Sequence, residues 1–166
     1  GTEALEKLPK QIRENPESVA ETIENNLRRV IIEERPTNPI YYEKMSVLLD
    51  ELIKRRKENT IEYEKYLQEI IDLSRKTVKP STTADYPPTL TTPAERSLYD
   101  NLGRNEACAI ELNAKILSTK KDGWRDHRVK LKEVRLAVAE LLRNYDITDE
   151  NHINSLLELI KNQREY

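Results

Sequence analysis

The chain has 166 residues, of which 35% are charged, and its mean hydropathy is −0.79. This length corresponds to about one domain with a single sizeable core. The 28 basic and 30 acidic residues nearly cancel, whereas a protein that lives by binding nucleic acid is usually basic overall. Composition therefore argues against an autonomous DNA-binding protein but leaves room for a local basic patch.

Cysteine content and hydropathy exclude further classes of protein. The single cysteine, Cys108, excludes an intramolecular disulfide and a zinc site built from cysteines. No stretch approaches the roughly 18 consecutive apolar residues of a membrane span. The first residues lack the pattern of a secretory signal, so we expect a cytoplasmic protein without membrane contact. The opening GTEALEKLP has the character of an internal stretch, and we expect the chain to be part of a longer protein.

The first half of the chain predicts three long helices. Asn15-Pro16 supplies a cap and a first-turn proline, and Pro36 ends the first helix. Asn38-Pro39 repeats this start for a second helix, and Asn59-Thr60 marks a break before the third. The apolar residues at helical spacing are Val19, Ile23, Leu27, Val30 and Ile31, then Tyr41, Met45, Leu48, Leu49, Leu52 and Ile53, then Tyr63, Tyr66, Leu67, Ile70, Ile71 and Leu73. Residues 14–78 should therefore form an up-down-up three-helix half.

A change of composition separates this half from the rest. Residues 79–92, KPSTTADYPPTLTT, have no periodicity and predict a linker or an ordered surface loop. Thr92 to Glu95 has the form of a capping box with proline at the first helical position, and Gly103 should close the short helix that follows. Asn105 should begin a fifth helix, and residues 120–123 should form a turn after it.

Two more helices are expected before the end of the chain. The sixth should run from about Arg125 to Asn144, and Thr148 should cap the last. The predicted inward residues of the last three helices are Ala109, Ile110, Leu112, Ile116 and Leu117, then Leu131, Val134, Val138, Leu141 and Leu142, then Ile153, Leu156, Leu157 and Ile160. No segment shows strand alternation. The predicted fold is all-α: residues 1–166 form one helical domain of about seven helices, with a second half at 93–166 joined to the first by the Pro/Thr-rich loop.

The sequence offers little for catalysis or metal binding. Three isolated glycines cannot form a phosphate-binding loop, and no Walker lysine motif or nuclease-type acidic core is present. His127 and His152 each lack a second ligand at helical spacing. Asp126 could orient His127, but no activated nucleophile accompanies the pair, so surface histidines are favoured. An enzyme with a pocket near Trp124 and Tyr99 is the least favoured alternative.

Cysteine and tyrosine side chains admit a structural and a functional interpretation. Cys108 lies between two alanines, and we expect it to pack between helices rather than to act as a nucleophile. Tyr41, Tyr42, Tyr63 and Tyr66 could stack on bases. Rings at helix edges with their hydroxyls in water are the favoured interpretation.

One basic run lies at the end of the second helix and is a candidate for contacting DNA or a partner. It consists of Lys54, Arg55, Arg56 and Lys57. Cations at a helix C-terminus also complement the helix dipole, and this simpler interpretation is favoured.

A second basic group is expected on the sixth helix. It consists of Arg125, Arg128, Lys132 and Arg135. At about 100° per residue these side chains fall within an arc of about 80° beside the apolar face. Such a stripe suits phosphates or an acidic protein surface, although a merely solvated face is the simpler alternative.

Several segments resemble the C-terminal helical domain of the R subunit, the motor and cleavage subunit, of type I restriction enzymes. The most specific are NPIYYEKMS, which begins at Asn38, and TPAERSLYDNLG, which begins at Thr92. The matching segments cover most of the chain and lie at 14–34, 38–56, 63–76, 86–103, 122–138 and 156–166. In one place the chain departs from the pattern, because Asp126-His127 stand where such sequences often have Gly-Asn.

The resemblance implies a prokaryotic parent protein similar to a type I site-specific deoxyribonuclease with ATP- and Mg²⁺-dependent DNA translocation. None of the family's ATPase or nuclease motifs occurs here, so no catalytic residue and no cofactor carries over to this chain. The implied role is a non-catalytic assembly module that joins the rest of the R subunit to the methyltransferase core of modification and specificity subunits. The alternative is a clamp that contacts duplex DNA during translocation.

Overall fold

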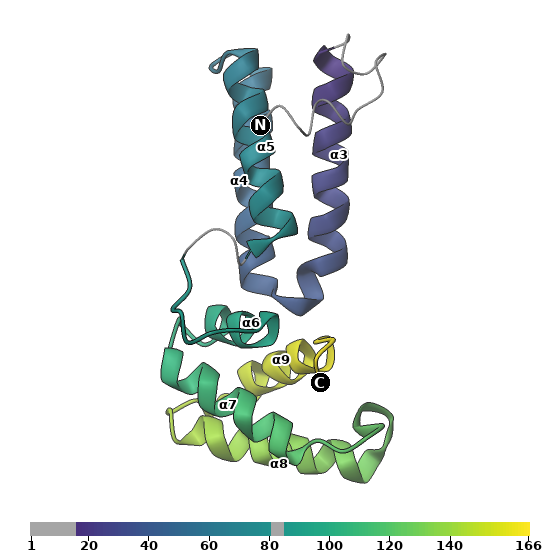
Figure 1. Ribbon diagram of the computed structural model, residues 1–166, viewed down its shortest axis with the longest axis vertical. Coiled ribbons are helices and arrows are strands. Elements are labelled where there is room, and N and C mark those ends of the chain that lie inside the picture. Colours follow the sequence, from purple (N-terminus) through teal and green to yellow (C-terminus); the bar gives the residue numbers. More distant parts are fainter. Residues whose placement is uncertain (1–15, 81–84) are drawn as a thin grey trace. The chain divides into compact units, whose positions relative to one another are not determined.

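The computed structural model describes residues 16–80 and 85–166, and within these ranges the chain forms seven α-helices and no strand (Figure 1). The predicted all-α fold of about seven helices is confirmed. The chain divides into two compact units. The first contains the described residues up to Arg35 and from Tyr41 to Pro80, and the second contains 85–166 together with Pro36–Ile40. The short connection between the first two described helices thus belongs to the second unit.

Three long helices form the first unit and lie side by side in Figure 1: α3 (Pro16–Glu34), α4 (Pro39–Lys57) and α5 (Tyr63–Val78). Proline occupies the first position of α3 and α4, as predicted, because its fixed φ suits a helix start and its missing N–H costs nothing there. The predicted cap of α3, Asn15, lies outside the described residues. After α4, Asn59 takes a left-handed φ of 56° and turns the chain toward α5.

One apolar cluster is shared by these three helices. Its buried members are Ala20, Leu27, Ile31, Tyr42, Met45, Leu49, Leu52, Ile53, Tyr66, Ile70 and Leu73. Tyr42 is buried and Tyr41 is half-buried. The prediction that the tyrosine hydroxyls point into water is wrong for Tyr42 and Tyr66, which are buried: Tyr42 donates to the Thr77 carbonyl at 3.4 Å, and Tyr66 donates to Glu24. Tyr41 donates to the Lys76 carbonyl at 2.5 Å in an exposed contact. A neighbouring helix supplies an acceptor in each case, which the period of a single helix cannot reveal.

The second unit contains four α-helices and a 3₁₀ turn. They are α6 (Pro93–Asn101), α7 (Glu106–Thr119), the 3₁₀ turn Trp124–Asp126, α8 (Arg128–Arg143) and α9 (Glu150–Lys161). Helix α7 packs on α6 and on α8, and α9 contacts α6 and α8. None of the helices in the described ranges combines the length and the apolar character that crossing a bilayer requires.

Side-chain caps fix the starts of α6 and α7. The Thr92 hydroxyl accepts the Glu95 N–H at 3.1 Å, as the capping box predicts. The Glu95 carboxylate reaches back to the N–H of Thr91, at 3.2 Å, one residue earlier than predicted. Asn105 accepts the Cys108 N–H at 3.0 Å and begins α7, also as predicted.

The start of α8 differs from the prediction. The helix begins at Arg128, three residues after the predicted Arg125, because Trp124–Asp126 form a 3₁₀ turn. His127 is the N-cap, and its Nδ1 accepts the Lys130 N–H at 3.3 Å. His127 therefore performs the capping work that an asparagine commonly performs.

Two further predictions for this half are wrong. Asp149, not Thr148, caps α9, because its carboxylate accepts the Asn151 N–H at 3.1 Å. Leu117 was predicted to face inward but is 49% exposed, because α7 buries only the stripe that ends at Ile116.

A second apolar cluster forms the core of this unit. Its buried members are Leu90, Ala94, Leu98, Tyr99, Leu102, Cys108, Ala109, Leu112, Ile116, Trp124, Val134, Val138, Leu142, Leu156, Leu157, Leu159, Ile160 and Tyr166. Because Leu90 is in this core and Tyr86 donates to Asp100, residues 85–92 form an ordered loop of the second unit. Residues 81–84 lie outside the described ranges.

Candidate functional site

Helix α8 carries a row of cations on its exposed side. It has five basic and two acidic residues, and it buries Val134, Ala137, Val138 and Leu142. The exposed cations, which lie beside this buried stripe, are Arg128, Lys132, Arg135 and Arg143. At about 100° per residue they lie within an arc of about 80°. We refer to these four residues as the α8 basic face.

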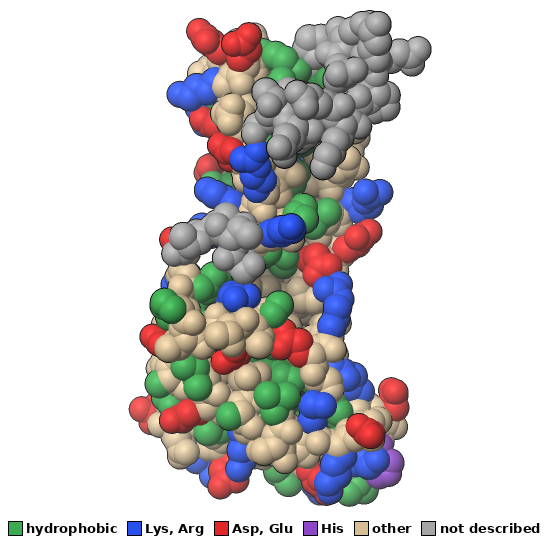
Figure 2. Space-filling view, in the orientation of Figure 1, with side chains coloured by type: hydrophobic (Ala, Val, Ile, Leu, Met, Phe, Trp, Pro, Cys, Tyr) green, Lys and Arg blue, Asp and Glu red, His purple; other side chains and the backbone are tan. Residues whose placement is uncertain are grey.

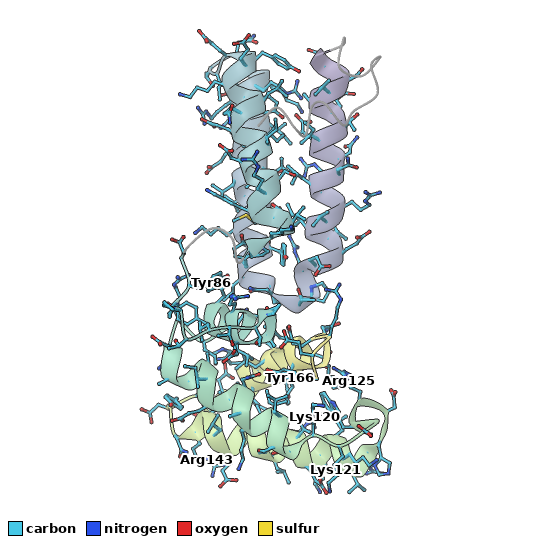
Figure 3. All side chains as sticks on the ribbon, in the orientation of Figure 1. Tyr86, Lys120, Lys121, Arg125, Arg143 and Tyr166 are labelled. Atoms are coloured by element: carbon cyan, nitrogen blue, oxygen red, sulfur yellow. The ribbon has the colours of Figure 1, made fainter. Side chains whose placement is uncertain are left out.

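Neighbouring charges do not neutralise this face. None of its four cations has a hydrogen-bond or ion-pair partner among the residues that the structure describes. The acidic Glu133 pairs instead with Lys121 at 3.0 Å, so Glu140 is the carboxylate of α8 that has no partner among the described residues. At 1.5 Å per residue, Arg128 and Arg143 are separated by about 22 Å along the axis. Figure 3 shows Arg143 at one end of α8 and Lys121 in the turn before the other end.

Arg125 was predicted to belong to this basic group, but its side chain makes hydrogen bonds within the protein. Its Nε donates to the Lys161 carbonyl at 2.8 Å, and its Nη2 donates to the Gln163 carbonyl at 2.7 Å. The guanidinium also lies 4.7 Å from the centre of the Trp124 ring. These contacts fasten the segment after α9 to the 3₁₀ turn, and Figure 3 labels Arg125 and Tyr166 in this region.

Arg143 is the member of the face that the sequence analysis missed. It follows Arg135 by eight residues and falls on the same side of the helix. Extending the helical period from Arg135 to the last turn of α8 would have identified Arg143 from the sequence. A cation in the last turn also complements the helix dipole, so its position alone does not reveal a binding role.

The four residues of the basic run at the end of α4 have different contacts, and Arg56 is held by residues of the neighbouring helices. Its Nε and Nη2 donate to one oxygen of Glu24, at 3.1 and 2.9 Å, and its guanidinium lies 5.4 Å from the centre of the Tyr66 ring. Tyr66 donates its hydroxyl to the same Glu24 oxygen. Burial raises the pKa of Tyr66, and the hydrogen bond to Glu24 raises it further. This triad, in which Glu24 and Tyr66 are buried and Arg56 is half-buried, connects α3, α4 and α5 and stabilises their packing.

The other residues of the run are more exposed. Arg55 pairs with Glu69 at 3.1 Å across α4 and α5. Lys54 and Lys57 are exposed and have no ionic partner in the described part of the chain. The run therefore contributes two available cations rather than four. Figure 2 shows basic and acidic side chains interspersed over the visible surface of both units.

A shallow groove of about 280 Å³ lies between α4 and α5. Its lining residues are Leu48, Glu51, Leu52, Arg55, Glu69, Asp72, Leu73 and Lys76. Leucines form its apolar part, and charges of both signs surround them. None of these lining residues is a Cys, His, Ser or Thr.

The candidates for metal binding and acid–base chemistry are not brought together. In the described ranges no group of three His, Cys, Asp or Glu side chains could hold a metal ion. His152 is exposed, and its Nε2 lies 3.5 Å from the Asn101 carbonyl oxygen. Cys108 is buried in the core, as predicted; burial raises the pKa of its thiol to about 11, and the charge of Glu111 contributes. Such a thiol is protonated at neutral pH and is a poor nucleophile.

The two most specific segments of the sequence meet in the second unit. Asn38 donates to Asp100 at 2.8 Å, and Asn101 donates to Asn38 at 2.8 Å. Tyr86 and Arg104 donate to the same Asp100 carboxylate. This cluster holds the segment Pro36–Ile40 in place, so the distinctive residues of both segments have a structural explanation.

The α8 basic face is thus the largest unpaired group of cations on one helix in the described part of the chain. Arginine and lysine side chains donate hydrogen bonds and carry no acceptor, so a group of this kind is chemically suited to an anionic surface. Comparison of the chain with protein-family models, with curated proteins and with solved structures found no match.

Proposed function

We propose that this chain is a non-catalytic assembly module of the R subunit of a type I restriction endonuclease. It docks the ATP-dependent translocase and nuclease of that subunit onto the methyltransferase core of modification and specificity subunits. The resemblance of residues 38–56 and 86–103 supports the family. The α8 basic face supports the docking role and is the observation that carries the proposal.

Physical chemistry explains why this face suits docking. Four unpaired cations on a chain of net charge −2 create a local positive potential that an acidic protein surface would complement. The neighbouring stripe of α8, which includes Val134, Val138 and Leu142, is buried in the core and anchors the helix in the second unit. A rigid helix presents its charges without a large loss of conformational entropy on binding.

The test is binding of the purified 166-residue chain to the methyltransferase core, measured by sizing chromatography and by titration. Lys132→Glu/Arg135→Glu should weaken binding at least about tenfold, since it replaces attraction by repulsion at two contacts. Lys54→Glu/Lys57→Glu is the matched control with the same change of charge, and it should alter the Kd less than about twofold. Absence of binding by the unaltered chain, under conditions where the complete R subunit binds, would overturn the proposal.

A second candidate function is a clamp on duplex DNA, and the spacing of the cations favours it. Four cations along about 22 Å of helix could neutralise up to four phosphates. The slope of log Kobs against log[salt] would then be about −3.6 at most, and removal of each cation would reduce it by about 0.9. Fluorescence anisotropy with a labelled duplex measures this slope. Absent or salt-independent binding would remove this candidate.

A further inference from the structure

The α8 basic face also carries exposed apolar side chains. Val129 is 60% exposed and Leu136 is 58% exposed. They are seven residues apart, or about 10.5 Å along the axis, and both lie on the side of α8 that is remote from its buried stripe. Lys132 lies between them, at i+3 from Val129 and i−4 from Leu136. Apolar and cationic side chains therefore share one surface.

The order of residues on this surface follows a heptad. If Val129 is placed at position a, Leu136 and Arg143 fall at the next two a positions. Lys132 and Ala139 then fall at d positions between them. A heptad seam is the pattern by which one helix packs along another. Within the described ranges, α8 therefore has a second stripe, with Val129 and Leu136 exposed on it, in addition to its buried one.

Charges flank this stripe asymmetrically. Arg128 and Arg135 fall at the first two of three g positions, and the buried Leu142 falls at the third. Glu133 and Glu140 fall at the two e positions. Glu133 is already paired with Lys121 at 3.0 Å, whereas neither arginine has a partner in the described ranges. A helix lying on this seam would therefore meet unbalanced positive charge along the Arg128–Arg135 edge.

We propose that the occupant of the α8 basic face is one acidic amphipathic helix of the docking partner. The inference rests on the proposed docking function and deepens it. Apolar residues of that helix, at seven-residue spacing, pack against Val129 and Leu136, and its carboxylates pair with Arg128 and Arg135. Lys132 and Arg143 cover the seam with their aliphatic stems and keep their charges at its edge.

The exposed apolar residues distinguish this occupant from duplex DNA. Phosphates interact with cations and gain nothing from a buried valine or leucine, because the backbone of DNA offers no apolar seam. A helix packed on this surface buries both residues, and burial of apolar side chains stabilises a complex. Two half-exposed side chains can thus contribute measurably to the affinity for a helix and not to the affinity for DNA.

The experiment removes the apolar seam without changing any charge. Val129→Ser/Leu136→Ser is compared with Ile32→Ser/Val47→Ser, a matched control at exposed apolar positions of α3 and α4. Three probes are titrated: the methyltransferase core, a labelled duplex, and a synthetic helical peptide with leucine at seven-residue spacing and glutamate beside it. The Val129/Leu136 variant should weaken binding of core and peptide about tenfold and leave duplex binding unchanged within about twofold.

The outcomes separate the two proposals. If the chain binds the methyltransferase core and Val129→Ser/Leu136→Ser does not weaken that binding, the proposal of an acidic helix is overturned. The proposed docking function is then unaffected. Peptide binding that depends on Val129 and Leu136, without any core binding, would support the acidic helix and overturn the docking function. Binding of the duplex alone, or of neither core nor peptide, would overturn both. Circular dichroism should show all variants to be folded, because the substituted side chains are exposed.

Discussion

Asn38 Nδ2 donates a 2.8 Å hydrogen bond to Asp100 Oδ2 across 62 positions of the sequence, and both side chains are buried. Asn101 Nδ2 donates in turn to the side-chain Oδ1 of Asn38 at 2.8 Å. Gln163 donates to the Thr37 carbonyl at 2.7 Å, so the same short segment is also held from the end of α9. Buried polar groups of this kind are costly unless all are satisfied, which makes the cluster sensitive to the loss of one member.

Asn38→Ala should therefore destabilise the protein by about 1–3 kcal/mol, because buried groups of Asp100 and Asn101 lose a partner. Urea unfolding followed by circular dichroism measures the change. Asn154→Ala, at an exposed position of α9, is the control and should change stability by less than about 0.5 kcal/mol. Equal effects of the two substitutions would contradict the structural role of Asn38.

Tyr66→Phe should reduce stability by about 1.5–3 kcal/mol near pH 7, because Glu24 loses a hydrogen bond to its charge. In the folded state the pKa of Tyr66 is raised above its ordinary value of 10 by burial and by Glu24. Its contribution is therefore complete below pH 10 and is lost as the pH rises through the folded value. The stability difference between wild type and Tyr66→Phe should stay constant from about pH 7 to 9 and narrow above pH 10. Urea titrations over this range measure it, and a difference that widens in alkali would refute the assignment.

Arg125→Ala and Arg135→Ala should behave differently although both remove one arginine from the same region of the sequence. Arg125 donates to two carbonyl oxygens, and its loss should cost about 1.5–3 kcal/mol. Arg135 is exposed without a partner in the described ranges, and its loss should change stability by less than about 0.5 kcal/mol. Thermal and urea unfolding of the two variants compare them directly. A large loss of stability in Arg135→Ala would show that the α8 basic face serves the fold.

Cys108 should not react with a disulfide reagent such as Ellman's reagent at pH 8 while the protein is folded. The side chain is 1% exposed, and burial raises the pKa of its thiol to about 11 from an ordinary value of 9. Stability contributed by this shift is complete below pH 9 and is lost as the pH rises to 11. Urea should release one reactive thiol per chain, and Cys108→Ala should release none. Rapid labelling of the folded protein would contradict the burial of this residue.

Local sequence determined where most helices begin and end. Proline at the first position of α3, α4 and α6 and the caps Thr92 and Asn105 act within one turn, so their effects can be read without knowing the fold. Helical periodicity likewise predicted most of the apolar core of the first unit, part of the core of the second unit, and three of the four cations on the α8 basic face. The start of α8 was missed because a 3₁₀ turn and a histidine cap replaced the expected first turn.

Only the tertiary structure decided which charged and polar side chains are available. Arg55, Arg56 and Arg125 looked equivalent to Arg128 and Arg135 in the sequence. Their acceptors are brought to them from other helices, and a spacing rule within one helix contains no information on such acceptors. The hydroxyls of Tyr42 and Tyr66 were misjudged for the same reason. The sequence thus determined the helices and their apolar faces, which depend on neighbouring residues, whereas packing between helices decided which cations remain free to bind a partner.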